Sequence, residues 1–349
     1  MTPPSTSLGT NGLFVAVLAL ASATAFAVAP TATTNAATSV TATTVQLNGA
    51  GNPGSEATTG WFRLSTTSPG ACDDAFGTRV PSTGGTSLGA GAVSAPYSVS
   101  TSGLLPGNTY YFCAITQNAS GTAFGGLLTF TTPALIPSVA TAAATSVTSF
   151  TALFNGSANP NGSAATGFFR YSTSSPGSCN TTFGTRAPAA GGTALGGGNG
   201  SVAYTETVSG LLAGTTYYYC ALSTNGIGTG VGNLLSFTTL VAVPAVTTTA
   251  ASSVTGTTAT LNGSVNPNGA STTGWFRLAS SDPGSCSDVF GTRVPAAGGS
   301  ALGSGSFATP YAQGATGLNP GTTYYYCSIA QNSQGTTLGS VLTFTTPDL

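Results

Sequence analysis

The chain has 349 residues, a length that suggests two or three domains. Only 4% of them are charged (six Arg, seven acids, no Lys and no His), which excludes the basic surface that nucleic acids or anionic lipids require. Hydrophobic residues reach 40% and aromatic residues 9%, so we expect a folded protein whose weakly charged surface tends to associate.

The chain begins with a segment typical of exported proteins. Residues 13–27 are apolar and end in Ala25-Phe26-Ala27, a small-x-small pattern that signal peptidases cleave. This segment is too short for a comfortable membrane span. We therefore expect residues 1–27 to be a secretory signal peptide, although no Lys or Arg precedes the apolar part. A retained hydrophobic anchor, or a strand donated to a neighbouring subunit, is the alternative.

The remainder repeats with a period of 107 residues, which is the spacing from Cys72 to Cys179 and from Cys179 to Cys286. The motifs Gly-Trp/Phe-Phe-Arg and Phe-Gly-Thr-Arg recur at the same offset without insertions. The period predicts three modules, residues 28–133, 134–240 and 241–349, each long enough to fold alone. Because the junctions are short and contain Pro, we expect a rod-like array.

Each module has the pattern of an antiparallel β-sandwich. Module 3 shows short alternating segments separated by turn motifs such as Asn266-Pro267-Asn268-Gly269, with no helical periodicity. The strands expected in module 3 span residues 257–262, 273–278, 310–317, 322–331 and 336–346.

One motif resembles a known fold specifically. The segment Gly317-Leu318-Asn319-Pro320-Gly321-Thr322-Thr323-Tyr324 looks like the bend before strand F of a fibronectin type III domain. Module 1 repeats it, and module 2 keeps it with Ala213 in place of Pro. The resemblance implies an all-β chain of three tandem fibronectin-III-like or Ig-like sandwiches, similar to bacterial fibronectin-III-like repeats of secreted surface proteins. It also implies corner tyrosines whose hydroxyls bond back to the bend, at Tyr110, Tyr217 and Tyr324.

The modules depart from that family by a long insertion, about residues 65–94 in module 1, between strand C and the strand before strand F. Six Cys in an exported chain predict disulfides, and fifteen pairings are possible. The repeat favours one bridge inside each module: Cys72–Cys113, Cys179–Cys220 and Cys286–Cys327. A redox-active pair would instead need a Cys-x-x-Cys spacing or a nearby Lys or His.

The position of the second Cys predicts what the bridge does. If the corner Tyr110 faces the core, strand alternation turns Cys113 to the outer face of the sheet. On strand C the same alternation places Trp61 and Arg63 outside. The tethered insertion should then cover these side chains and create a second, smaller core.

All basic residues occupy two repeat-equivalent positions, whereas no acid recurs in all three modules. We expect each guanidinium to donate to backbone carbonyls of the insertion or to stack on an aromatic ring. A row of ligand-contacting arginines along the array is the alternative. The residues are Arg63, Arg170 and Arg277 on strand C, and Arg79, Arg186 and Arg293 in the insertion.

The sequence lacks the usual catalytic chemistry, so we expect no enzyme activity. Without His there is no common general base or metal ligand, and without Lys no Schiff base can form. Asp73-Asp74 could suggest Ca²⁺, but module 2 has Asn180-Thr181 there, which favours a solvated loop. We expect no catalytic residue, no metal site and no cofactor.

Three functions fit these observations. The leading hypothesis is a secreted structural protein that self-associates into a filament, sheath or surface appendage. The alternative is an adhesin or carbohydrate-binding array with a cell-surface or glycan partner, and its candidate binding surface is Trp61, Tyr111, Trp275 and Tyr325. The third is a spacer region of a larger secreted enzyme. No nucleic-acid partner is expected, and no membrane span after removal of the signal.

Overall fold

The structure is a computed structural model that describes residues 1–6 and 28–348. Most of the expected signal segment, residues 7–27, lies outside the described residues. The described part consists of β-strands, turns and irregular segments without a helix, which confirms the all-β prediction. Within it, no helix has the length and apolar character needed to cross a membrane.

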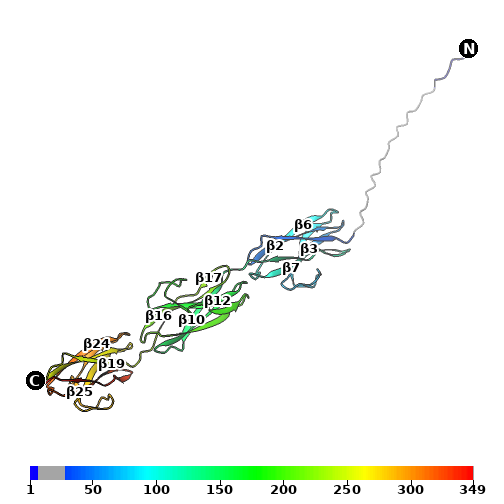
Figure 1. The fold of residues 1–349 in the computed structure, drawn as a ribbon. Coiled ribbons are helices and arrows are strands. Elements are labelled where there is room, and N and C mark those ends of the chain that lie inside the picture. The colour runs from blue at the N-terminus through cyan, green and yellow to red at the C-terminus, as the bar shows by residue number, and fades with distance from the viewer. Residues whose placement is uncertain (7–27, 349) are drawn as a thin grey trace. The chain divides into compact units, whose positions relative to one another are not determined.

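Module 1 is a two-layer antiparallel sandwich, with β2 and β6 in one layer and β3 and β7 in the other (Figure 1). One sheet has the order β1-β2-β6, and the other has the order β4-β3-β7-β8, with β5 also on β3 and β9 also on β7. The strands are β1 (Thr31–Thr38), β2 (Thr44–Asn52), β3 (Thr58–Ser65), β4 (Thr78–Val80), β5 (Thr86–Gly89), β6 (Ala95–Ser102), β7 (Thr109–Asn118), β8 (Gly121–Phe124) and β9 (Leu128–Thr131).

Modules 2 and 3 repeat this arrangement strand for strand. Module 2 consists of β10 (Ser138–Thr145), β11 (Thr151–Asn159), β12 (Ala165–Ser172), β13 (Thr185–Ala187), β14 (Thr193–Gly196), β15 (Val202–Ser209), β16 (Thr216–Thr224), β17 (Thr229–Val231) and β18 (Leu235–Thr238). Module 3 consists of β19 (Ala245–Ser252), β20 (Thr258–Asn266), β21 (Thr272–Ala279), β22 (Thr292–Val294), β23 (Ser300–Gly303), β24 (Thr309–Thr316), β25 (Thr323–Asn332), β26 (Gly335–Leu338) and β27 (Leu342–Thr345). These three tandem sandwiches confirm the predicted fold class.

The strand pairings described here stay within a module. The chain divides into two compact units, Met1–Gly103 with Thr109–Thr131, and Leu104–Asn108 with Thr132–Leu349. The first unit contains the sheets of module 1, and the second contains those of modules 2 and 3. The proposed boundaries after residues 133 and 240 fall between β9 and β10 and between β18 and β19, and they remain predictions.

Strand alternation builds the main core between the two sheets. On β2, Val45 and Leu47 are buried while the neighbouring polar side chains point out. From the opposite sheet, Phe62 and Phe112 complete the core, and both are fully buried. Gly60 lies under a ring of this core, because a Cβ at that position would lie 2.8 Å from Cζ of Tyr97. This close approach explains why a glycine opens the Gly-Trp/Phe-Phe-Arg motif in each module.

The structure corrects two details of the expected strands. The insertion is not wholly irregular, since it contains two short strands in each module that pair with strand C, such as β4 and β5 with β3. The last expected strand, residues 336–346, is divided into β26 and β27. At the break, the N–H of Ser328 donates to the side-chain oxygen of Thr248 at 3.1 Å. The side chain of a residue from the other sheet thus accepts the hydrogen bond that the neighbouring strand would otherwise accept from Ser328.

The bend before strand F is tied by its tyrosine. The hydroxyl of Tyr217 accepts a hydrogen bond from the N–H of Leu212, and that of Tyr324 accepts one from the N–H of Asn319, each at 2.9 Å. Both rings are buried against Phe237 and Phe344, respectively.

Replacing Tyr324 with Phe should lower the free energy of unfolding of module 3 by about 1 kcal/mol, because the partly buried N–H of Asn319 loses its acceptor. Denaturant unfolding in a Trp61→Phe background, in which Trp275 is the only tryptophan, measures this by fluorescence. The neighbouring Tyr325→Phe is the control, since the hydroxyl of Tyr325 makes no hydrogen bond among the described residues. Equal effects of the two substitutions would contradict a role for the corner hydroxyl.

Candidate functional site: the disulfide-pinned excursion

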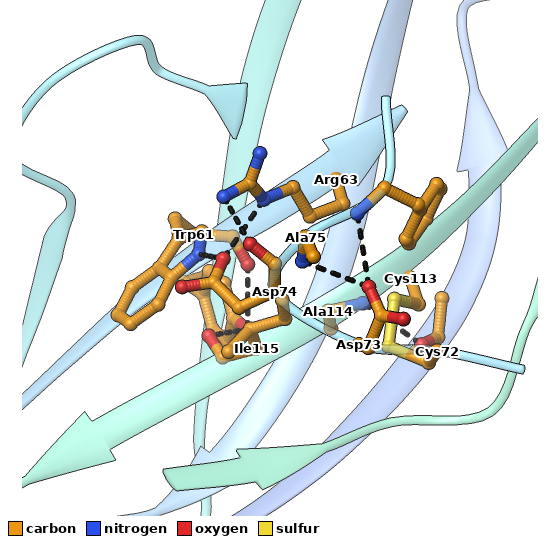
Figure 2. Close-up of a disulfide and its surroundings, with 12 residues drawn as sticks. Trp61, Arg63, Cys72, Asp73, Asp74, Ala75, Cys113, Ala114 and Ile115 are labelled. Atoms are coloured by element: carbon orange, nitrogen blue, oxygen red, sulfur yellow. Dashed lines mark hydrogen bonds and ion pairs between the residues drawn. A yellow bond between two sulfur atoms is a disulfide. The ribbon is translucent and has the colours of Figure 1, made fainter. Parts of the chain in front are cut away.

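We call the segment between strand C and the strand before strand F the excursion; it spans residues 66–94, 173–201 and 280–308 in the three modules. The three predicted disulfides tie each excursion to the outer face of the larger sheet: Cys72–Cys113, Cys179–Cys220 and Cys286–Cys327. Their Cα–Cα distances are 6.0, 6.1 and 6.0 Å, within the usual range. Figure 2 shows the bridge of module 1 beside strands β3 and β7.

A second, smaller core lies under each excursion, as predicted. In module 1, Trp61, Cys113 and Ile115 are buried on the outer face and pack against Cys72 and Phe76 of the excursion, with Leu127 at the edge. Modules 2 and 3 contain the equivalent clusters. We call this group the outer cluster. Its members in modules 2 and 3 are Phe168, Cys220, Leu222, Cys179 and Phe183, and Trp275, Cys327, Ile329, Cys286, Phe290 and Val341.

An acid of the excursion holds two donors of strand C in modules 1 and 3. Asp74 Oδ1 accepts from Trp61 Nε1 at 2.9 Å and from Arg63 Nε at 2.8 Å (Figure 2). Asp288 Oδ1 does the same for Trp275 at 2.8 Å and Arg277 at 2.9 Å. The arginine side chains are only 17% exposed, whereas the Asp side chains are 42% and 44% exposed. The carboxylate therefore caps two largely covered donors from the solvent side.

Asp73 and Asp74 lie in an exposed loop, and only the contacts of Asp74 with strand C were not anticipated from the sequence. Asp73 does shape the loop, since its Oδ1 accepts the N–H groups of Ala75 and Phe76. Asp74, however, is held by Trp61 and Arg63. A signal for this pairing is present in the sequence, because Trp and Asp occur together in modules 1 and 3 and are replaced together in module 2.

Module 2 has no acid at the equivalent position, and its strand-C arginine is held differently. Phe168 replaces the Trp and Thr181 replaces the Asp. Arg170 turns its Nη1 toward the carbonyls of Phe183 and Gly184, at 3.0 and 3.2 Å. Its Nε is buried and has no hydrogen-bond partner among the described residues.

The second arginine of each module stacks on the outer cluster. The guanidinium carbon of Arg79 lies 4.5 Å from the centroid of the Trp61 ring, and Arg79 also donates to the carbonyls of Pro81 and Gly84. Arg186 lies 4.1 Å from Phe168, and Arg293 lies 4.6 Å from Trp275. Each arginine closes one side of the cluster and ties the second half of the excursion to it.

Burial removes part of the candidate binding surface. Trp61 and Trp275 are only 3% and 5% exposed, because the excursion and the stacked arginines cover their rings. They are therefore not available as a binding platform in this structure. Tyr111 and Tyr325 remain half-buried on the outer face, and a binding role for them stays a prediction.

A buried tyrosine of the smaller sheet supports the outer cluster from inside. The hydroxyl of Tyr97 donates toward the carbonyl of Ile115 at 3.0 Å and lies 3.4 Å from that of Trp61. Burial raises the pKa of Tyr97 and that of the equivalent Tyr204. Burial raises the pKa of Tyr311 to about 12, although hydrogen bonds with Ser328 and Ile329 oppose the shift. These hydroxyls stay neutral and bind the strand carbonyls beneath the excursion.

Two further features of the described residues concern metal ligands and a surface hollow. No group of three or more Asp, Glu or Cys side chains that could hold a metal ion occurs in residues 1–6 and 28–348. A hollow of about 620 Å³ lies in module 3 beside β21, β22 and the segment after β24, lined by residues that include Leu278, Arg293 and Tyr324.

No family model and no curated protein matches the chain. Among solved structures, it is similar to the FN1-FN3 domains of chicken CNTN1, at 14% identity and a TM-score of 0.35, over 91% of this chain and all of that one. It is also similar to the sensor domain of the anti-sigma factor RsgI4 of Pseudobacteroides cellulosolvens, at 23% identity and a TM-score of 0.22, over 30% of this chain and 91% of that one. Both similarities are weak, and the fold assignment rests on this chain's own strand pairings.

Proposed function

We propose that the protein is a non-enzymatic extracellular structural protein whose modules associate with other copies into a filament, sheath or surface appendage. Three disulfides, with no free cysteine among the described residues, fit an oxidising compartment outside the cell. The proposal depends mainly on where the few charged residues lie.

The three-stranded sheet of each module presents a face without charged side chains. In module 1, β1, β2 and β6 contain no charged residue, and Thr44, Gln46 and Asn48 point outward from the central strand. The equivalent sheet of module 3 is also uncharged, and that of module 2 contains only Glu206. Glu206 follows the inward alternation of Tyr204 and Val208 rather than facing out. By contrast, all six arginines lie on strand C or in an excursion.

Such a face suits contact with a second copy. Two uncharged faces meet without like-charge repulsion, and each is rich in small hydroxyl and amide side chains. Three strands of eight residues cover about 14 by 27 Å, or about 400 Å². A standard interface buries about 800 Å² per partner, so one module is too small and several must act together. Tandem repetition therefore provides the area that a single module lacks.

Lysine on these faces should prevent assembly. Gln46→Lys, Leu153→Lys and Thr260→Lys occupy equivalent outward positions on β2, β11 and β20. The triple variant should remain a monomer at concentrations where the unmodified protein forms fibres or large oligomers, because like charges would face each other. Added salt should partly restore assembly by screening. Analytical ultracentrifugation and electron microscopy measure both effects.

The matched control adds the same three charges elsewhere. Thr66→Lys, Thr173→Lys and Ser280→Lys lie at exposed, equivalent positions at the start of each excursion. This control should assemble like the unmodified protein. Monomers of the unmodified protein at all concentrations would refute the proposed function, whereas equal loss of assembly in both triple variants would refute only the assigned face.

A glycan-binding array is the second candidate, supported by a half-buried tyrosine that recurs on the outer face at Tyr111, Tyr218 and Tyr325. An aromatic ring that is partly exposed on a rigid strand is a suitable platform for a sugar. Binding to a glycan array that disappears in the triple Tyr→Ala variant would favour this function. An array without signal for the unmodified protein would exclude it.

A further inference from the structure

Strand C of module 2 carries a cationic donor beneath the excursion that has no partner within the described residues. Arg170 Nε is buried and unpaired within the described residues, although the same guanidinium donates from Nη1 to Phe183 and Gly184. A buried donor without a partner is costly, and that of a charged group more so. Such an atom in an otherwise well-paired cluster indicates an interaction that the chain itself does not supply.

Modules 1 and 3 show which group belongs there. In both, the equivalent Nε donates to an Asp carboxylate, at 2.8 Å in Arg63 and 2.9 Å in Arg277. The loop that presents the carboxylate has the same local geometry in module 2. Asn180 Oδ1 accepts the N–H groups of Thr182 and Phe183, as Asp73 Oδ1 accepts those of Ala75 and Phe76. Thr181 therefore stands where Asp74 stands, but it carries no anionic group.

The local charge agrees with this comparison. Strand C and the excursion of module 1 carry two arginines and two acids, Asp73 and Asp74, and those of module 3 carry two arginines with Asp282 and Asp288. The same segments of module 2 carry Arg170 and Arg186 without an acid. Module 2 thus presents a net positive site within an excursion framework that is neutral in its two neighbours.

We propose that this part of module 2 is a binding site for a carboxylate, which takes the place that Asp74 and Asp288 fill in the other modules. The carboxylate accepts from Arg170 Nε, and it enters when the exposed side chain of Thr181 turns aside. Phe168 provides no second donor, in contrast to Trp61, so binding is weak, in the millimolar range. The carboxylate comes either from a small acid such as a sugar uronate or from an acidic side chain of a second copy. The site does not depend on the proposed assembly.

The six arginines allow a direct test by NMR, because their Nε–H signals are few enough to assign singly. Sodium acetate is titrated into the full chain against sodium chloride at equal ionic strength. The Arg170 signal, identified by its loss in Arg170→Lys, should shift and saturate. The signals of Arg63 and Arg277 should not, since their Nε atoms are already paired. A response that is absent, or equal for all six arginines, would overturn the proposal.

Two variants should exchange the acetate responses of Arg170 in module 2 and Arg63 in module 1. Thr181→Asp supplies the carboxylate within the chain and should abolish the acetate response of Arg170. Asp74→Thr removes it from module 1 and should make Arg63 respond. Amide spectra verify that each variant is folded. An Arg170 response that survives in folded Thr181→Asp would contradict the assigned position.

The source of the carboxylate is separated by two further titrations. Sodium glucuronate should act like acetate if the site accepts a sugar acid. A protein dilution series without added acid should move the Arg170 signal if a second copy supplies the carboxylate. If none of acetate, glucuronate and dilution shifts this signal, the site does not bind carboxylates.

Discussion

Replacing Cys72 and Cys113 together with Ala should lower the free energy of unfolding of module 1 by about 4 kcal/mol. The bridge closes a loop of 41 residues, and releasing a loop of that length restores conformational entropy of about this size to the unfolded chain. Because the fully buried Cys113 is also part of the outer cluster, the loss of packing adds to this effect. No other single bond in the module has so large an expected contribution.

Trp61 provides the measurement. In a Trp275→Phe background it is the only tryptophan, so its fluorescence follows module 1 alone during denaturant unfolding. The midpoint should fall strongly without the bridge, and Trp61 should become accessible to quenchers before the sandwich unfolds. The control is the matched pair Cys286→Ala and Cys327→Ala, which should leave the transition of module 1 unchanged. A midpoint that does not move would show that the excursion is held by its other contacts.

The main features of the site could be predicted because they follow from local rules. Strand alternation, applied from the corner Tyr110, places Cys113 on the outer face, and the bridge then brings the excursion over Trp61. Because the same residues recur in all three modules, each prediction could be checked against three segments of the sequence. The prediction thus combined a period of two along a strand, a period of 107 along the chain, and the inward-facing corner tyrosine that the resemblance to fibronectin type III domains implies.

Other features could not be predicted because they depend on contacts between distant residues. The short strands β4 and β5 lie in a Gly-, Ser- and Pro-rich segment without alternation, and they pair only because β3 offers a free edge. The break between β26 and β27 exists because Thr248, far away in sequence, supplies an acceptor to Ser328. Neither feature leaves a periodic pattern in its own segment.

The role of Asp74 was accessible to sequence reasoning but required comparing pairs of positions. Taken singly, position 74 varies between modules and looks unconstrained. Considered together with position 61, position 74 is clearly constrained, since Trp accompanies Asp and Phe accompanies Thr. The structure supplies the reason, a shared hydrogen-bond acceptor for the indole and the guanidinium. Variation between repeats is informative when two positions change together.

This pairing leads to the second large expected effect. Asp74→Thr should destabilise module 1 by about 2 kcal/mol, because Trp61 Nε1 and Arg63 Nε both lose their acceptor in a largely covered site. Trp61→Phe should cost about as much through lost packing. The double variant reproduces module 2, in which the guanidinium turns to backbone carbonyls. It should therefore cost less than the sum by about 1 kcal/mol. Hydrogen exchange of the β7 amides measures all three variants.

The reverse substitutions in module 2 test the same coupling through a gain of stability. Phe168→Trp alone adds an indole N–H without an acceptor and should destabilise module 2, whereas Thr181→Asp alone pairs Arg170 Nε and should stabilise it. Together they should stabilise module 2 by more than the sum of the two, because the new carboxylate then serves both donors. Additive effects in both modules would mean that Trp and Asp act independently and that their joint occurrence has another cause. If the Trp and Asp positions are coupled in module 1 but not in module 2, the coupling depends on the surrounding excursion loop and not on these two residues alone.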